Sequence, residues 1–187
     1  MNLHDIHGDQ LVNELDALGI HFLRGGDDAP AVYKPIDLIV ALASSPEARL
    51  RLALIPLFLQ HAEYASFASA AKSLMPERAK VFCVCYYTAA HLFQKMYREK
   101  IKNLLGHVDP LPDLFSGEID LQKTPDPQTR LQLLAQRQRE LSGDNINWLG
   151  TYHHGWERWL RPMERKQRQE QPENCPETFG VNNSPYT

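Results

Sequence analysis

The stretch of the chain that most constrains the fold runs over residues 76–106. Its first half, residues 81–93, is apolar on nearly every side and leaves no polar stripe wide enough to face water. Pro76 before this stretch and Gly106 after it are typical helix start and stop signals. The sequence therefore predicts one helix of roughly thirty residues, about 45 Å long at 1.5 Å per residue. A helix that is apolar all round must be surrounded by other helices.

Further helices are expected on both sides of this one. Apolar spacing and capping signals place them near residues 11–18, 35–44, 46–59, 63–75, 126–141 and 145–161. Pro56 predicts a kink, and Pro162 predicts a bend or an end near Arg161. The fold class is therefore all-α: a single-domain bundle of six or seven helices around a long buried central helix. Residues 1–170 form this domain, and the polar residues 171–187 are expected to be a disordered tail.

The segment 107–123, between two predicted helices, is expected to be an ordered loop. It contains Pro110, Pro112 and Gly117, which disfavour a helix. Apolar residues alternate with these, and we expect four of them to pin the loop to the core: Leu111, Leu114, Phe115 and Ile119. Such a loop is long enough to be functional, although packing alone also explains it.

Composition limits the class of protein. The 187-residue chain has a net charge of −3 and a pI near 6.2, which argues against a protein that coats nucleic acid. Three cysteines, an odd number, do not form a typical disulfide framework, so a reducing, cytoplasmic location is expected. The first residues do not have the pattern of a secretory signal. The apolar run 52–59 is far shorter than the roughly 20 residues that cross a bilayer, so no membrane association is expected.

The histidines of the predicted last helix raise a second interpretation, a metal site. His153 and Glu157 are four residues apart, and His154 and Glu157 are three apart, so one pair could share a helix face, with His61 or His91 as a partner. The chain lacks the second ligand pair that such bundle sites use, and Gly155 interrupts the motif. We therefore predict no metal and no cofactor, and we keep His153, His154 and Glu157 as alternative ligands only.

No catalytic residue is predicted. Cys83 and Cys85 point to nearly opposite sides of a helix and are expected to be buried apolar groups. The acidic turn at residues 25–28 lacks the Lys-Ser/Thr pair of a phosphate-binding loop and is expected to be a solvated turn. No nucleophile, base and acid occur at spacings that assemble a triad. Whether the protein is an enzyme stays open, with a non-enzyme favoured.

The last helix carries two features. Large apolar residues recur at intervals of three and four and form a seam: Leu149, Tyr152, Trp156, Trp159 and Met163. Basic residues recur in the same way on this helix (Arg158, Arg161, Arg165 and Arg168) and on the central one (Lys95, Arg98 and Lys102). Solvated helix ends, with Glu157–Arg161 and Glu164–Arg168 pairs, explain both basic stripes. If the stripes were adjacent, they would form an electropositive ridge.

The sequence favours a non-catalytic helical interaction protein, the partner or regulator of another protein in a bacterial two-component (toxin–antitoxin-like) module. Its predicted partner-binding residues are Trp156, Trp159, Arg158, Arg161 and Arg165, on a last helix expected to expose its aromatic and basic residues. A metal-dependent helical-bundle enzyme is the alternative. Nucleic-acid binding is the weaker alternative, and a homo-oligomer is possible. The identity of the partner and any ligand pocket stay open.

Overall fold

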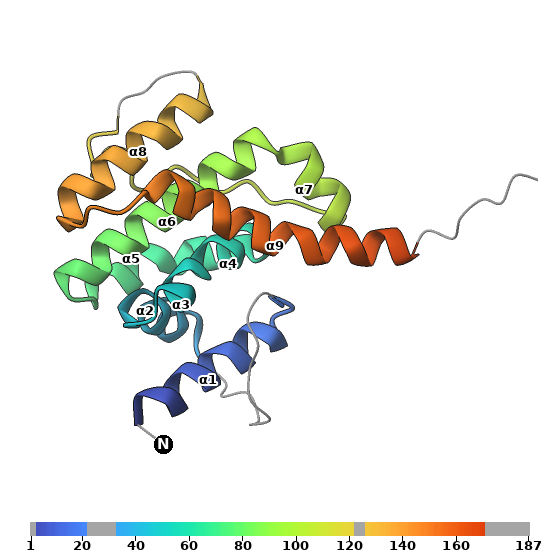
Figure 1. Ribbon diagram of the computed structural model, residues 1–187, viewed down its shortest axis with the longest axis horizontal. Helices are drawn as coiled ribbons and strands as arrows, with labels where there is room; N and C mark the ends of the chain where they lie inside the picture. Colours follow the sequence, from blue (N-terminus) through green and yellow to red (C-terminus); the bar gives the residue numbers. More distant parts are fainter. Residues whose placement is uncertain (1–2, 22–32, 122–125, 171–187) are drawn as a thin grey trace, which may run out of the picture.

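A computed structural model of the protein describes residues 3–21, 33–121 and 126–170, and in these ranges it contains helices and no strand (Figure 1). The all-α prediction is confirmed. The predicted tail, residues 171–187, lies outside the described residues. The elements, in chain order, are α1 (Leu3–Ala17), α2 (Pro35–Ser44), α3 (Ala48–Leu52), α4 (Leu54–Gln60), the 3-10 turn η1 (Ala62–Tyr64), α5 (Ala65–Ser73), α6 (Glu77–Met96), α7 (Arg98–Leu105), α8 (Pro127–Ser142) and α9 (Trp148–Glu170).

The central helix is α6. Every residue from 82 to 94 is buried, which confirms the prediction that its apolar half is surrounded. Helices α4 and α8 make the most extensive contacts with it, and α2, α5 and α9 also pack against it. Within the described residues, none of the helices combines the length and the apolar character that crossing a bilayer requires.

Two predicted helices are each divided in two. Residues 76–106 form α6 and α7, because the backbone at Tyr97 leaves the helical region (φ −122°, ψ 27°). The Tyr97 ring stacks on Trp156, with ring centroids 4.8 Å apart, so aromatic packing sets this break without a proline or a glycine. Residues 46–59 divide at Ala53, three residues before the expected kink. Pro56 therefore lies in the first turn of α4, where its missing N–H leaves no helical hydrogen bond unmade.

Residues at the helix ends set where α8 begins and ends and where α9 begins. Asp126 caps α8, because its carboxylate accepts hydrogen bonds from the backbone N–H groups of Gln128 (3.3 Å) and Thr129 (2.8 Å). Gly143 ends α8 in the left-handed region at φ +70°. Asn147 caps α9, which begins at Trp148: its side-chain oxygen accepts the N–H of Gly150 at 3.0 Å.

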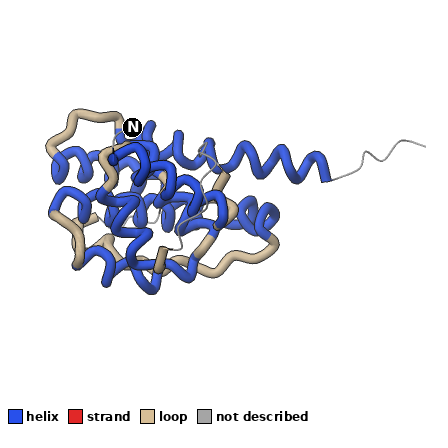
Figure 2. The backbone as a smooth tube through the Cα atoms, turned by 90° about the horizontal axis from the view of Figure 1, so that it is seen from below, coloured by secondary structure: helices blue, strands red, loops and turns tan. Residues whose placement is uncertain are grey.

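Pro162 predicted a bend or an end of the last helix near Arg161; an end there is wrong, because α9 continues through Pro162 to Glu170, and the bend stays a prediction. Pro162 is exposed and lies in the interior of the helix. The residues after it are held by contacts with α7, which compensate for the hydrogen bond that a proline deletes. The last turns of α9 extend beyond the other helices (Figure 2).

The seam predicted on the last helix is confirmed at Tyr152, Trp156 and Trp159, whereas Leu149 and Met163 are only partly buried. Trp148 lies outside the predicted seam but on the same inner side of α9. Trp148, Tyr152, Trp156 and Trp159 are all buried, and they lie against aromatic residues of α6 or against each other. Gly155, between them, is also buried: a Cβ atom there would lie 2.8 Å from Cδ1 of Leu52. This glycine therefore allows α3 and α9 to approach closely.

Candidate binding surface

The outward side of α9 carries four exposed arginines, which we call the arginine face: Arg158, Arg161, Arg165 and Arg168. Their spacing of three, four and three residues places them in one row along the helix. The opposite side of the same helix is fixed in the core by its tryptophans. The positive charges are thus presented by a helix whose position is set by packing.

A groove between α3 and α9 continues this row toward the start of α9. Its volume is about 470 Å³, and we call it the α3–α9 groove. Thr151, His154 and Arg158 line it from α9, at the same three-and-four spacing as the arginine face. The other lining residues are Ala48, Arg49, Leu52, Ile146, Asn147 and Gly150. The groove and the arginine face therefore form one continuous surface.

Ion pairs on α9 follow the sequence prediction in part. Arg161 pairs with Glu157 at 2.7 Å, as its four-residue spacing predicts. The Glu164 carboxylate instead pairs with Lys100 of α7 at 2.8 Å. The Arg168 Nε donates to the backbone oxygen of Glu164 (3.3 Å) and not to its carboxylate. The predicted Glu164–Arg168 side-chain pair is therefore wrong.

The two basic stripes of the sequence do not merge into a ridge. Helices α7 and α9 lie side by side, joined by the Lys100–Glu164 ion pair and by a bond from the Gln167 side chain to the backbone oxygen of Asn103 (3.2 Å). Because Lys100 faces α9, Arg98 and Lys102 lie about 160° away around α7, at about 100° per residue. Arg98 and Lys102, the basic row of α7, are therefore turned away from α9, and Lys95, the third residue of the predicted stripe, lies on α6.

The expectation that the tryptophans of the last helix are exposed is wrong. Trp156 is 5 % and Trp159 is 2 % exposed, because both rings complete the core. The Trp156 ring stacks on Phe93, with ring centroids 5.4 Å apart. Replacing either tryptophan by alanine would cost about 3–5 kcal/mol of stability, so such variants do not test a binding surface. Whether a partner binds at this helix stays a prediction.

The alternative metal ligands are not brought together as a site. His153 packs edge-on against the Phe93 ring at 5.6 Å, His154 lines the α3–α9 groove, and Glu157 pairs with Arg161. Gly155, which interrupts the motif, serves the contact between α3 and α9. Among the described residues, no three His, Cys, Asp or Glu side chains are grouped as metal ligands would be.

The two cysteines of α6 are buried, as predicted. Burial is the main cause that raises the pKa of Cys83 and of Cys85 to about 12. A thiol with that pKa holds its proton at neutral pH, and a protonated thiol is a poor nucleophile. Neither cysteine is therefore suited to covalent catalysis.

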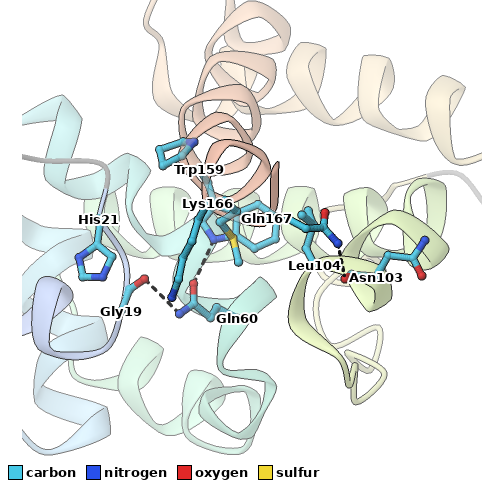
Figure 3. A pocket seen from close by; sticks show the side chains of 10 residues that line it. Gly19, His21, Gln60, Asn103, Leu104, Trp159, Lys166 and Gln167 are labelled. Atoms are coloured by element: carbon cyan, nitrogen blue, oxygen red, sulfur yellow. Dashed lines mark hydrogen bonds between the residues drawn. The ribbon is translucent and has the colours of Figure 1, made fainter. Parts of the chain in front are cut away.

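A second cavity, of about 420 Å³, lies on the other side of α9 between α1, α4 and α7 (Figure 3). Gln60 is its central polar residue. Its Nε2 donates to the backbone oxygens of Leu18 (3.1 Å) and Gly19 (3.2 Å), and its Oε1 accepts the Trp159 indole N–H at 3.1 Å. The hydrogen bonds of this amide thus join the end of α1 to α4 and α9, which is a structural role.

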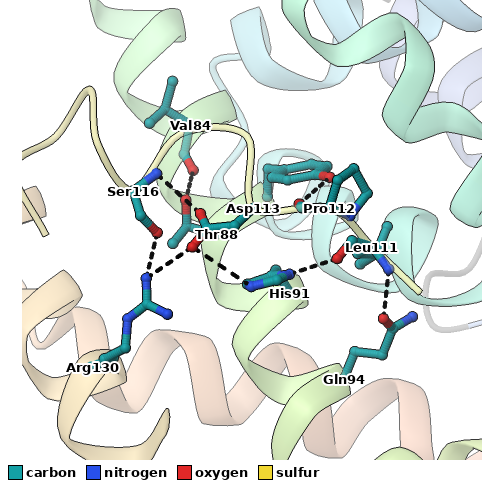
Figure 4. A network of polar contacts seen from close by, with 10 residues as sticks. Val84, Thr88, His91, Gln94, Leu111, Pro112, Asp113, Ser116 and Arg130 are labelled. Atoms are coloured by element: carbon teal, nitrogen blue, oxygen red, sulfur yellow. Dashed lines mark hydrogen bonds and ion pairs between the residues drawn. The ribbon is translucent and has the colours of Figure 1, made fainter. Parts of the chain in front are cut away.

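The loop 107–121 is held by a polar cluster that the sequence analysis missed (Figure 4). From α6, the His91 Nδ1–H donates to the Leu111 oxygen at 2.8 Å, and the Gln94 Oε1 accepts the Leu111 N–H at 2.7 Å. From α8, Arg130 donates to Asp113 at 3.1 Å and to the Ser116 hydroxyl oxygen at 2.7 Å. The signal in the sequence was the spacing of His91 and Gln94, two polar residues three apart in an apolar helix.

Burial determines how this cluster titrates. Burial lowers the pKa of His91, and the positive charges of Lys95 and Arg130 lower it further, against the opposing effects of the Leu111 hydrogen bond and Asp113. Burial acts to raise the pKa of Asp113, but hydrogen bonds from Ser116 and Arg130 outweigh it and leave that pKa below its usual value. His91 is therefore held in its neutral form beside an ionised Asp113.

The apolar anchors predicted for this loop are confirmed in three cases of four. Leu111, Phe115 and Ile119 are buried, whereas Leu114 is 37 % exposed. His91 itself is only 4 % exposed, so the cluster has little contact with solvent through this side chain. The cluster is a clamp for the loop, since its described contacts join the loop to α6 and α8.

Comparison with known proteins finds no matching family model, no matching curated protein and no matching solved structure. The surface and the fold alone therefore carry the functional inference.

Proposed function

We propose that this protein is a non-catalytic interaction protein that binds an acidic surface of a partner protein through the arginine face. The observation that carries the proposal is the row of four exposed arginines on a helix whose other side is buried. A guanidinium group binds a carboxylate with two parallel hydrogen bonds, and a helix that is already ordered loses little entropy on binding. These properties suit a specific protein contact.

Charge favours a protein partner over a nucleic acid. The chain is acidic overall, with a net charge of −3, and the basic row of α7 faces away from the arginine face. Glu157 pairs with Arg161, and Glu164 lies beside the row, so acids interrupt the positive charge along α9. A partner with a few spaced carboxylates fits this surface better than a continuous phosphate backbone. That the partner belongs to a bacterial two-component (toxin–antitoxin-like) module stays a narrower prediction.

Charge reversal on the arginine face tests the proposal. We would compare the unaltered protein with an Arg161→Glu/Arg165→Glu variant and with a control variant, Lys34→Glu/Lys102→Glu. The control reverses two exposed charges, one on the residue before α2 and one on α7, and gives the same net charge. Each protein is used to recover binding partners from extracts of its own host, with and without nuclease treatment.

We expect a protein that is recovered by the unaltered and control proteins, is lost from the arginine-face variant, and is insensitive to nuclease. A partner retained equally by all three proteins would refute the arginine face as the binding site. Recovery that disappears after nuclease treatment would instead favour nucleic-acid binding.

A further inference from the structure

Beyond the class of partner, we infer that the segment bound here is an acidic amphipathic α-helix of the partner, with an apolar side chain in the α3–α9 groove and carboxylates along the arginine face. This inference rests on the proposed function, because it specifies what occupies the same surface. Three features of the surface support it: one row of side chains, a groove with an apolar wall, and helical spacing of the charges.

The row of side chains is continuous from the groove to the end of α9. Thr151, His154 and Arg158 line the groove, and Arg161 and Arg165 continue the row at intervals of three and four residues. A ligand that follows α9 therefore meets the groove first, where Arg49 is already paired with Glu47, and the cationic face next. Charge complementarity sets its polarity: the apolar end lies near the start of α9 and the acidic end near its close.

The groove can accept an apolar side chain. Ile146, at one end, is 43 % exposed, and the aliphatic Leu52 side chain forms part of the wall. Ala48 and Gly150 are small, so their side chains leave space there. A volume of about 470 Å³ is in the range of pockets that enclose a bound group, and anchor residues at interfaces commonly fill such pockets.

The spacing of the charges favours a helix over an extended segment. A partner helix beside α9 has the same rise per residue, so carboxylates at intervals of three and four can meet the arginines in register. An extended segment gains most from pairing with a sheet edge, and the described part of this protein has no strand. A helix satisfies its own backbone groups and needs only side-chain contacts.

Site-specific photo-crosslinking in the full-length chain tests this inference. A photoreactive amino acid replaces His154, in the groove, and in a control protein it replaces Leu74, which is 66 % exposed beyond the end of α5. Crosslinked segments are identified by mass spectrometry, and the segment found only from position 154 is synthesised as a peptide. Binding of that peptide is measured by fluorescence anisotropy.

We expect a segment with an apolar residue and, on one side of it in the sequence, carboxylates at intervals of three and four. Its peptide should bind the Arg161→Glu/Arg165→Glu variant at least about tenfold more weakly, and replacing the matching peptide glutamates by arginine should restore binding to that variant. A crosslinked protein segment without this pattern would overturn the helix and leave the proposed function standing.

Two other outcomes separate the claims. If position 154 gives no protein crosslink while the arginine-face variant still loses its partner, the groove is empty in the complex and the inference fails alone. If that variant also keeps its partner, the inference and the proposed function fail together.

Discussion

The Arg130–Asp113 pair allows a prediction about how the loop clamp contributes to stability. The Arg130 side chain is 8 % exposed, whereas the Asp113 side chain is 37 % exposed. Removing the carboxylate by Asp113→Ala leaves a buried cation. Of the two acceptors that Arg130 has in the described part of the chain, Asp113 and Ser116, the Ser116 hydroxyl alone then remains. Because an unpaired buried charge is costly, we expect a loss of about 3–5 kcal/mol in the free energy of unfolding.

The opposite substitution should cost less. Arg130→Met keeps an apolar side chain of similar length in the buried position and leaves behind an Asp113 that water can reach. This variant loses the two hydrogen bonds of the guanidinium, and hydration of Asp113 compensates for part of that loss. We expect the free energy of unfolding to fall by about 1.5–3 kcal/mol. The double variant should be more stable than Asp113→Ala alone, because it contains no unpaired buried cation.

Urea unfolding, followed by tryptophan fluorescence and by far-ultraviolet circular dichroism, measures all four free energies of the cycle. Coincident curves from the two probes establish that one transition is observed. Equal costs for the two single variants, or a double variant that loses the sum of both, would refute the reasoning that the buried guanidinium depends on the carboxylate.

Two other predictions concern titratable groups. The lowered pKa of His91 means that, as pH falls, the unfolded chain takes up a proton before the folded one, so stability falls below about pH 6.5 by up to about 1.4 kcal/mol per pH unit. Urea unfolding from pH 7.5 to 5.5 should show this loss in the unaltered protein and in a His107→Gln control, but less of it in His91→Gln; equal losses would contradict it. Cys83 and Cys85, with pKa values raised to about 12, should not react with a thiol reagent at pH 8 in folded protein whose third cysteine is replaced by serine. Rapid reaction before urea is added would show that they are accessible.

The features that the sequence predicted correctly depend on local chemistry. The apolar run of α6 requires burial on all sides, and Asp126 and Gly143 bound α8 by hydrogen bonds and backbone geometry confined to a few residues. The large rings of α9 share one face because of their spacing alone. Each of these needs only the period of a helix or the chemistry of its ends.

The features that could not be predicted from the sequence depend on contacts between residues far apart in the chain. The break at Tyr97 is set by stacking on Trp156, and the length of α9 beyond Pro162 is held by Lys100 and other residues of α7. Helical spacing showed that the tryptophans of α9 share a face, but not that the arginines take the outer one. The orientation of α7, which separates the two basic rows, depends on the same long-range packing.

The placement of Trp159 has a practical consequence. Its indole is buried against the core on one side of α9 and donates to Gln60, while the arginines of the same helix face outward. A bound molecule that shifts α9 would alter the surroundings of this indole and hence the wavelength or intensity of its emission. The intrinsic tryptophan fluorescence of the unlabelled protein can thus report binding on the outward side of α9, and a titration needs no attached dye.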